Sequence, residues 1–188
     1  MKKTLIILVL LFSSSVVAED IADFEIEGMS IGDSLLDYTN RVFIETEKVE
    51  YYKDKTFSSI NIISSDSIID LKVYKQLVVS FITNDKKYFI QAISGIIKYD
   101  KDLQACKHMK SEIVSDLLNM FGNLDHELDI YKSGFYGEHT YTKFYFKNND
   151  NIKISCVKYH PEHDFEDHLR ISVNTTEFQE WLNYKAYK

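Results

Sequence analysis

Two short polar turns place the strongest limit on what this chain can fold into. Residues 84–85 and 148–151 each separate two stretches that are rich in β-branched and aromatic side chains. A connection this short joins antiparallel neighbours, because a parallel crossover needs a dozen residues or more. We therefore expect two antiparallel hairpins and a sheet built largely from them.

Periodicity along the rest of the chain predicts strands and helices in alternating groups. Period-two alternation and β-branched residues predict strands at 56–63, 71–81, 87–99, 140–147, 152–159 and 168–174. Helices are expected near 33–40, with a second one over 41–50 as an option, at 102–121, and after Asn174. The order is roughly α-βββ-α-βββ-α, an α+β fold with antiparallel sheet packed against helices. A tandem duplication of the two halves stays open.

Local signals indicate where several elements begin and end. Ser30 and Asp33 have the spacing of a capping box, and Asn174 with Glu177 has the same spacing before the last helix. Gly122 follows the apolar stripe of the central helix and is a favoured residue just after a helix. Gly95 lies inside an expected strand, where a glycine indicates either a β-bulge or a close approach of another segment.

The first eighteen residues predict export. Residues 1–3 are basic, residues 5–12 form an unbroken apolar run, and Val16-Val17-Ala18 fits the site that signal peptidase cleaves. A membrane span needs about 20 apolar residues, so we expect a signal peptide at 1–18 and no span after its cleavage. We expect a periplasmic or extracellular protein whose mature part, residues 19–188, forms a single α+β domain.

The charge balance argues against a nucleic-acid partner. Cleavage after residue 18 removes Lys2 and Lys3 and no acid, which leaves 20 basic and 29 acidic side chains and a formal charge of −9. The only arginines are Arg41 and Arg170. A protein that binds phosphate backbones needs a dominant basic patch, so we expect no binding to nucleic acid.

A four-residue motif, Gly32-Asp33-Ser34-Leu35, matches the GDSL signature of an esterase and lipase superfamily. That family needs a late Asp-x-x-His pair, because a serine is inert without an imidazole beside it. None of the six histidines has an aspartate three residues before it, and the Gly-x-Asn element of the family is absent. We interpret the motif as the start of a helix and a decoy, so no catalytic residue is predicted; a hydrolase that uses Ser34 is the less favoured alternative.

Residues 160–168 form a segment with three histidines and four carboxylates. His160, His163 and His168 are weak candidates for metal ligands, because histidine and carboxylate bind zinc and related ions. The spacing matches no established zinc motif, and the segment lies between two expected strands. A charged hairpin loop has these features for solvation alone, and we favour that interpretation. We therefore predict no metal and no cofactor, with metal binding through this loop as an alternative.

The two cysteines are predicted to form a disulfide. Cys106 shares the apolar face of its helix with Leu103 and Met109, and Cys156 shares a strand face with Ile154. Both sulfurs should point into the layer between helix and sheet. Export would place them in an oxidising compartment, where such pairs are usually bridged. Two buried free thiols are the competing interpretation.

The segment FEIEGMSIGDSLLDY, residues 24–38, resembles the opening of a family of small, exported, uncharacterised proteins from low-GC marine bacteria. Residues 84–97 and 167–182 are similar to the same family, so the resemblance covers most of the mature chain. It implies that residues 28–38 form a fixed structural unit. The family has no assigned activity, so the resemblance implies no catalytic or binding residue.

The function expected from these patterns is binding rather than catalysis. An acidic, exported chain without a complete catalytic set suits a non-enzymatic binding or protein-interaction module. Its partner would be an envelope protein or a small ligand, and the sequence identifies neither.

Overall fold

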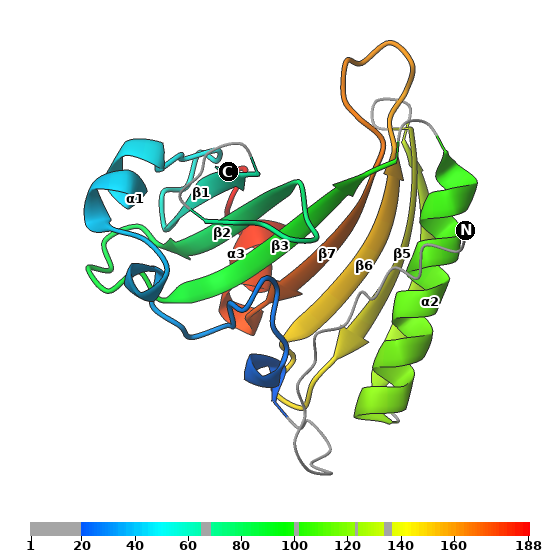
Figure 1. The fold of residues 1–188 in the computed structure, drawn as a ribbon, viewed down its shortest axis with the longest axis horizontal. Coiled ribbons are helices and arrows are strands. Elements are labelled where there is room, and N and C mark those ends of the chain that lie inside the picture. Colours follow the sequence, from blue (N-terminus) through cyan, green and yellow to red (C-terminus); the bar gives the residue numbers. More distant parts are fainter. Residues whose placement is uncertain (1–19, 65–68, 100–101, 123, 134–136) are drawn as a thin grey trace.

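Seven antiparallel strands form one sheet in the computed structural model of this protein (Figure 1). The structure describes residues 20–64, 69–99, 102–122, 124–133 and 137–188, so the expected signal peptide lies outside the described residues. The strands are β1 (Phe57–Ile63), β2 (Gln76–Ile82), β3 (Ile90–Lys98), β4 (Asp125–Ser133), β5 (Gly137–Tyr145), β6 (Asn151–Lys158) and β7 (His168–Asn174). They lie in the order β1-β2-β3-β7-β6-β5-β4, which makes β7 the central strand. The α+β prediction is confirmed.

Both expected hairpins are present. β2 pairs with β3 across the turn at residues 83–89, and β5 pairs with β6 across residues 146–150. The two groups of strands join through the antiparallel β3–β7 pair, in which Ser94 lies opposite Ser172. Residues far apart in the sequence therefore meet at the centre of the sheet.

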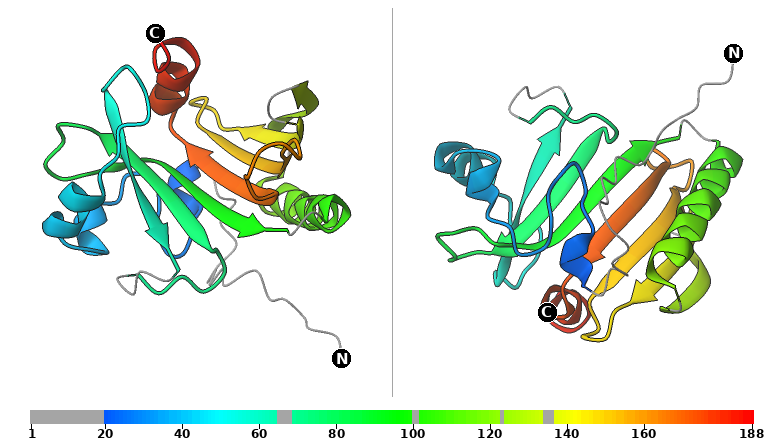
Figure 2. Two further views of the ribbon diagram at one scale, coloured as in Figure 1. Left: turned by 90° about the horizontal axis from the view of Figure 1, so that it is seen from above. Right: turned by 60° about the horizontal axis from the view of Figure 1, so that its bottom comes forward.

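Three α-helices and two short 3-10 turns accompany the sheet. The helices are α1 (Arg41–Glu47), α2 (Leu103–Phe121) and α3 (Thr176–Tyr184), and the 3-10 turns span Ile21–Asp23 and Leu35–Asp37. Figure 2 shows α2 and α3 on opposite sides of the sheet. In the described part of the chain, no helix combines the length and the apolar character needed to cross a membrane.

The main hydrophobic core lies on one face of the sheet, beneath α2 and the N-terminal segment. Apolar side chains alternate along the central strands, so that Ile154, Ile171 and Val173 all face this layer. A smaller cluster on the other face packs α3 onto the sheet through Trp181 and Phe178 against Phe57. We call these two sides the α2 face and the polar face, because buried serines line the second one.

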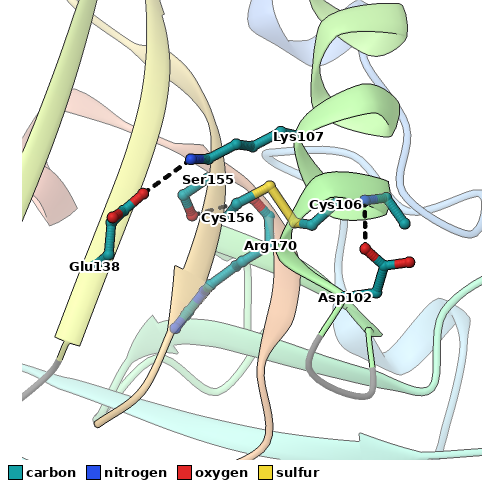
Figure 3. Close-up of a disulfide and its surroundings, with 8 residues drawn as sticks. Asp102, Cys106, Lys107, Glu138, Ser155, Cys156 and Arg170 are labelled. Atoms are coloured by element: carbon teal, nitrogen blue, oxygen red, sulfur yellow. Dashed lines mark hydrogen bonds and ion pairs between the residues drawn. A yellow bond between two sulfur atoms is a disulfide. The ribbon is translucent and has the colours of Figure 1, made fainter.

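The predicted disulfide between Cys106 and Cys156 is confirmed (Figure 3). It joins the first turns of α2 to the middle of β6, with 5.9 Å between the Cα atoms, and both residues are buried. Asp102 caps the helix by accepting from the Ala105 amide at 2.9 Å. The helix ends before Gly122, whose φ of 65° suits a residue without a side chain.

Some expected elements differ from the structure. The helix expected at 33–40 shrinks to the 3-10 turn at residues 35–37, with Ser34 as its N-cap instead of Ser30. The strand expected from residue 71 begins at Gln76, because the amides just before it are taken by a carboxylate from another segment. Strand β4 was missing from the expected order, and the last helix is capped by Thr175 instead of Asn174.

Gly95 marks a close approach, the second of the two options left by the sequence. A Cβ at this position would lie 2.4 Å from ring carbons of Tyr74, so only glycine lets that ring pack against the strand. The register shift between β2 and β3 lies elsewhere, at Ser80 and Phe81.

Glu27 ties the N-terminal segment to the chain before β2. Its carboxylate accepts from the backbone amides of Lys72, Val73 and Tyr74 at 2.7 to 3.1 Å. Three amides on one carboxylate form charge-assisted hydrogen bonds, which are stronger than neutral ones. This carboxylate therefore fixes a connection that sequence periodicity does not reveal.

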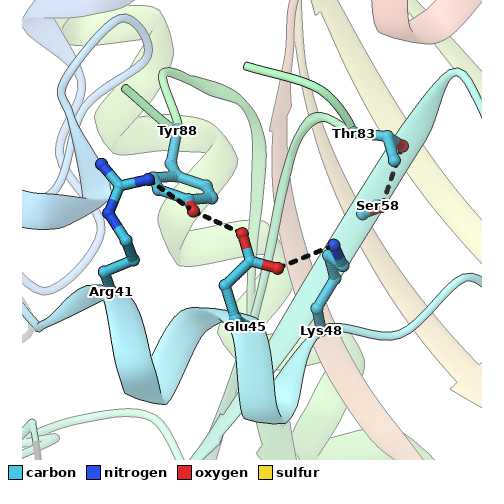
Figure 4. Close-up of polar contacts among 6 residues, drawn as sticks. All are labelled: Arg41, Glu45, Lys48, Ser58, Thr83 and Tyr88. Carbon is cyan, nitrogen blue, oxygen red and sulfur yellow. Dashed lines mark hydrogen bonds and ion pairs between the residues drawn. The ribbon is translucent and has the colours of Figure 1, made fainter. Parts of the chain in front are cut away.

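A second polar link docks α1 on the β2–β3 turn (Figure 4). The buried Tyr88 donates to Glu45 at 2.5 Å and accepts from Arg41 at 3.1 Å, and Lys48 pairs with Glu45 at 2.9 Å. The hydrogen bond to Glu45 is the main cause that raises the pKa of Tyr88. Arg41 is thus engaged within the fold, which leaves Arg170 as the other arginine to explain.

Candidate functional site

The serine of the GDSL motif has a structural role in the described chain. Ser34 Oγ donates to the backbone oxygen of Lys87 at 2.6 Å and accepts from the Leu36 amide at 3.2 Å. A hydroxyl whose proton is given to a carbonyl is not activated as a nucleophile, since activation needs a base in that place. The neighbouring Asp33 accepts from the Ser30 amide and from the Tyr38 hydroxyl.

The three candidate metal ligands do not converge on one point. The rings of His160 and His163 lie 6.4 Å apart, whereas His168 packs against Tyr159 and its Nδ1 lies 2.9 Å from the Glu166 oxygen. Among the described residues there is no group of three or more histidine, cysteine or acidic side chains placed to hold a metal ion. The loop does contribute His168 to one end of the polar face.

The polar face has a floor of buried hydroxyl groups that crosses five strands. Ser59 and Ser80 share a hydrogen bond of 2.8 Å, and Ser94 donates to Ser172 at 2.9 Å. Ser155 on β6 donates to the backbone oxygen of Arg170 at 3.4 Å. All five serines are at most 9% exposed. Buried polar groups need hydrogen-bond partners. A row of buried, hydrogen-bonded serines across a sheet is therefore a specific arrangement and differs from ordinary exposed polar residues.

Arg170 stands on this floor at the centre of the sheet. Its side chain is directed away from the disulfide and α2 (Figure 3), and Nη2 donates to Ser94 Oγ at 3.1 Å. This is the only side-chain hydrogen bond of the guanidinium within the described chain, where no carboxylate lies within ion-pair distance. Its Nε is buried and has no hydrogen-bond partner among the described residues. A buried guanidinium without a counter-charge lowers the stability of the fold. Unfavourable charge arrangements of this kind are concentrated at functional sites.

Two lysines extend the positive charge from Arg170 toward β5. Lys143 and Lys153 face each other directly across the β5–β6 pair. Ser155, two residues after Lys153 on β6, pairs with Arg170 on β7, so Arg170 lies diagonally from Lys153. Like charges in directly opposed positions destabilise a sheet. We call Lys143, Lys153 and Arg170 the cationic patch.

Aromatic rings, not carboxylates, contact the two lysine amines. Lys153 Nζ lies 4.2 Å from the ring centre of Tyr141, and Lys143 Nζ lies 4.6 Å from that of Tyr145. Burial lowers the pKa of both lysines, and for Lys153 the nearby Lys143 and Arg170 lower it further. Glu127 on β4 lies opposite Lys143 and accepts from the Tyr145 hydroxyl at 2.8 Å. Glu127 and Asp129 both act to raise the pKa of Lys153, so the acidic groups near the patch lie on the edge strand.

Tyrosines border the other side of Arg170. Tyr52 packs edge-on between Trp181 and Tyr187, with ring centres 5.0 and 5.1 Å away. The amides of Lys53 and Asp54 both donate to the Ala186 oxygen, which holds the loop and the C-terminal segment together. Burial, aided by Tyr187, raises the pKa of Tyr52 to about 12, so the hydroxyl stays neutral.

Burial also lowers the pKa of Arg170, while the nearby hydroxyls of Tyr52 and Tyr159 act in the opposite direction. Arginine nevertheless remains charged in proteins because its ordinary pKa is above 12. The site therefore combines a fixed positive fork, two lysine amines and hydroxyl donors. These groups donate hydrogen bonds and hold positive charge, so the matching ligand group is an oxyanion.

Arg170 was named from the sequence only as one of two arginines and was given no function. The signal that would have revealed it is the row of small hydroxyl residues at outward positions of several strands, including Ser155 and Ser172. Lys143 and Lys153 also alternate with apolar residues in the sequence, but their opposition depends on the strand register.

Comparison with family models, with curated proteins and with solved structures finds no match for this chain. The resemblance of residues 24–38 to a family of exported proteins therefore stays a prediction.

Proposed function

We propose that the protein is an exported, non-enzymatic binding module that holds a ligand through an oxyanion on its polar face. The oxyanion is a carboxylate, phosphate or sulfate, bound between Lys153 and Arg170. The observation that supports this best is the guanidinium of Arg170, which has one hydrogen bond to Ser94 and a buried Nε without a partner among the described residues. Arginine binds such groups with two parallel hydrogen bonds.

We favour binding over catalysis because Arg170, the central group of the patch, is not a proton-transfer group. Arg170 stays charged, and the hydroxyl of Tyr52 has a raised pKa, so neither suits general acid–base work near neutral pH. Ser34 lies in another part of the fold and gives its proton to the Lys87 oxygen. The proposed ligand is a small molecule or an anionic group of an envelope protein.

Calorimetric titration with phosphate, sulfate and succinate tests this proposal. We expect at least one of the three to bind the purified mature chain and to raise its Tm, because a ligand that binds only the folded state stabilises it. Arg170→Lys keeps the charge but removes the fork, and Lys153→Met removes one amine at similar length. Each should weaken binding by about tenfold or more, the value of one charge-assisted hydrogen bond.

Lys158→Met is the matched control, because Lys158 is exposed and lies on the same strand with the opposite orientation. It should leave the affinity unchanged. Failure of all three oxyanions to bind, or equal weakening by the three variants, would overturn the proposed site.

A further inference from the structure

A groove on the α2 face lies apart from the cationic patch. It has a volume of about 690 Å³ and lies between α2 and the β4–β5 hairpin. Its lining includes Lys107 and Lys110 from the helix, Leu128 and Ile130 from β4, and Thr140 from β5. Sites for small molecules commonly measure about 300–1,000 Å³, so the groove has the size of a ligand site.

The apolar part of the groove is exposed to a degree that folding alone does not explain. Leu128 and Ile130 are 70% and 63% exposed, although both project from a strand on the face that elsewhere carries the main core. Helix α2 lies over β6 and β7 and leaves this outer part of the face uncovered. Adjacent exposed apolar side chains on a soluble protein mark contact sites.

The polar part of the groove holds a lysine amine and a hydroxyl group that lack partners among the described residues. Lys107 is paired with Glu138 at 2.9 Å (Figure 3), but Lys110 forms no ion pair or hydrogen bond within the described chain. Thr140 is 5% exposed, and its Oγ1 has no hydrogen-bond partner among the described residues. A buried hydroxyl without an acceptor is costly, and an oxygen bound in the groove would satisfy it.

Asp129 also lines the groove, but its carboxylate lies on the polar face, because Asp129 alternates with Leu128 and Ile130 along β4. Asp129 accepts from the Ile130 amide at 2.7 Å and from the Tyr141 hydroxyl at 3.4 Å. Burial, together with the neighbouring Lys107, lowers the pKa of Lys110, so the protein itself does not stabilise that charge. The groove thus complements a molecule with a negative end and an apolar body.

We propose that this groove binds an anionic amphiphile of the fatty-acid class. Its carboxylate accepts from Lys110 Nζ and Thr140 Oγ1, and its hydrocarbon chain covers Leu128 and Ile130. The site lies on the opposite side of the sheet from the cationic patch, so either proposal stands or fails without the other.

Titration with dodecanoate tests the proposal, with dodecanol and butyrate as probes that lack the charge and the long chain. Dodecanoate should bind the groove with a Kd below about 1 mM, and both other probes should bind there at least about tenfold more weakly. Lys110→Met should weaken dodecanoate binding by about tenfold, and Thr140→Val, which keeps the side-chain volume, by about fivefold. Lys72→Met, at an exposed lysine outside the groove and outside the cationic patch, should leave it unchanged.

Three results would overturn the proposal. The first is no dodecanoate binding in that concentration range, and the second is equal weakening by all three variants, which indicates nonspecific adsorption. The third is a wild-type dimer, dissociated by Leu128→Asp, that binds no dodecanoate, because a second copy of the chain would then be what covers the groove.

Discussion

The disulfide should supply a large share of the stability, and the size of its contribution follows from the chain topology. Cys106 and Cys156 are 50 residues apart in the sequence, so the bridge removes closure entropy from a long loop of the unfolded chain. The chain-entropy relation gives roughly 4 kcal/mol for a loop of this size. A single domain has a total stability of about 5–15 kcal/mol, so loss of the bridge brings the fold close to its limit.

Urea unfolding of the oxidised and the reduced wild-type protein measures this contribution directly. With an m-value of roughly 2 kcal/mol/M, a loss of about 4 kcal/mol moves the midpoint down by about 2 M. Reduction retains both sulfur atoms in the core, so it isolates the effect of the cross-link. The double variant Cys106→Ala/Cys156→Ala should lose about 1–2 kcal/mol more, because alanine leaves small cavities at two buried positions.

A loss below about 1 kcal/mol on reduction would refute this reasoning. It would mean that the unfolded chain already keeps α2 near β6, or that native-state strain cancels the entropy gain. Equal losses for the reduced protein and the double variant would contradict only the cavity argument. The bridge also holds the end of α2 that carries Lys107 and Lys110, so reduction should weaken the groove as a site before the sheet itself unfolds.

Two further predictions concern single side chains. Glu27→Gln should lower the free energy of unfolding in urea by about 2 kcal/mol, because the carboxylate that accepts from the amides of residues 72–74 loses its charge. Glu25→Gln, at an exposed position nearby, should cost almost nothing. Similar losses for both variants would contradict the role given to Glu27. Burial lowers the pKa of His168, so between that lowered value and the ordinary value near 6.5 the unfolded chain binds more protons and stability falls as pH falls. Wild type should therefore lose stability relative to His168→Gln when unfolding is measured at pH 5 instead of pH 7. A difference that does not change with pH would rule the titration out.

The elements that the sequence predicted well are those whose signals are local. The turn at Asn84–Asp85 and the apolar stripe of residues 102–121 depend on neighbours a few positions away, and both are present in the structure. The disulfide was predictable because each cysteine lies on an identifiable apolar face. The helix expected at 33–40 failed because a capping pattern does not ensure that the residues after it can bury an apolar face.

Strand β4 was missed although its signal is present in the sequence. Leu128 and Ile130 alternate with Glu127 and Asp129, which is a period-two pattern. No element was predicted from the sequence for residues 125–133, where charged side chains separate the few apolar positions. Edge strands commonly carry such charges, because they discourage pairing with other chains.

The residues of the two proposed sites were beyond sequence reasoning for a different reason. Whether Arg170 has a counter-charge depends on β3, β6 and the loop that holds Tyr52, all of which meet β7 only after folding. The same holds for Thr140, whose missing hydrogen-bond partner is visible only once the flanking segments are in place. Absence of a partner is a property of the packed structure, and no local pattern encodes it.

The charge distribution also constrains how an anion would be bound. The whole chain has a formal charge of −7, so at long range an anion is repelled, and salt screens this repulsion beyond about 8–10 Å. Attraction at the cationic patch must then come from contact: half-buried amines and the guanidinium of Arg170, in surroundings where hydrogen bonds to charge are strong. Such a site selects a ligand by shape and hydrogen-bond geometry after encounter. A broad basic surface, by contrast, attracts polyanions by long-range electrostatics. The charge distribution therefore supports the proposal that the ligand group on the polar face is a single small oxyanion.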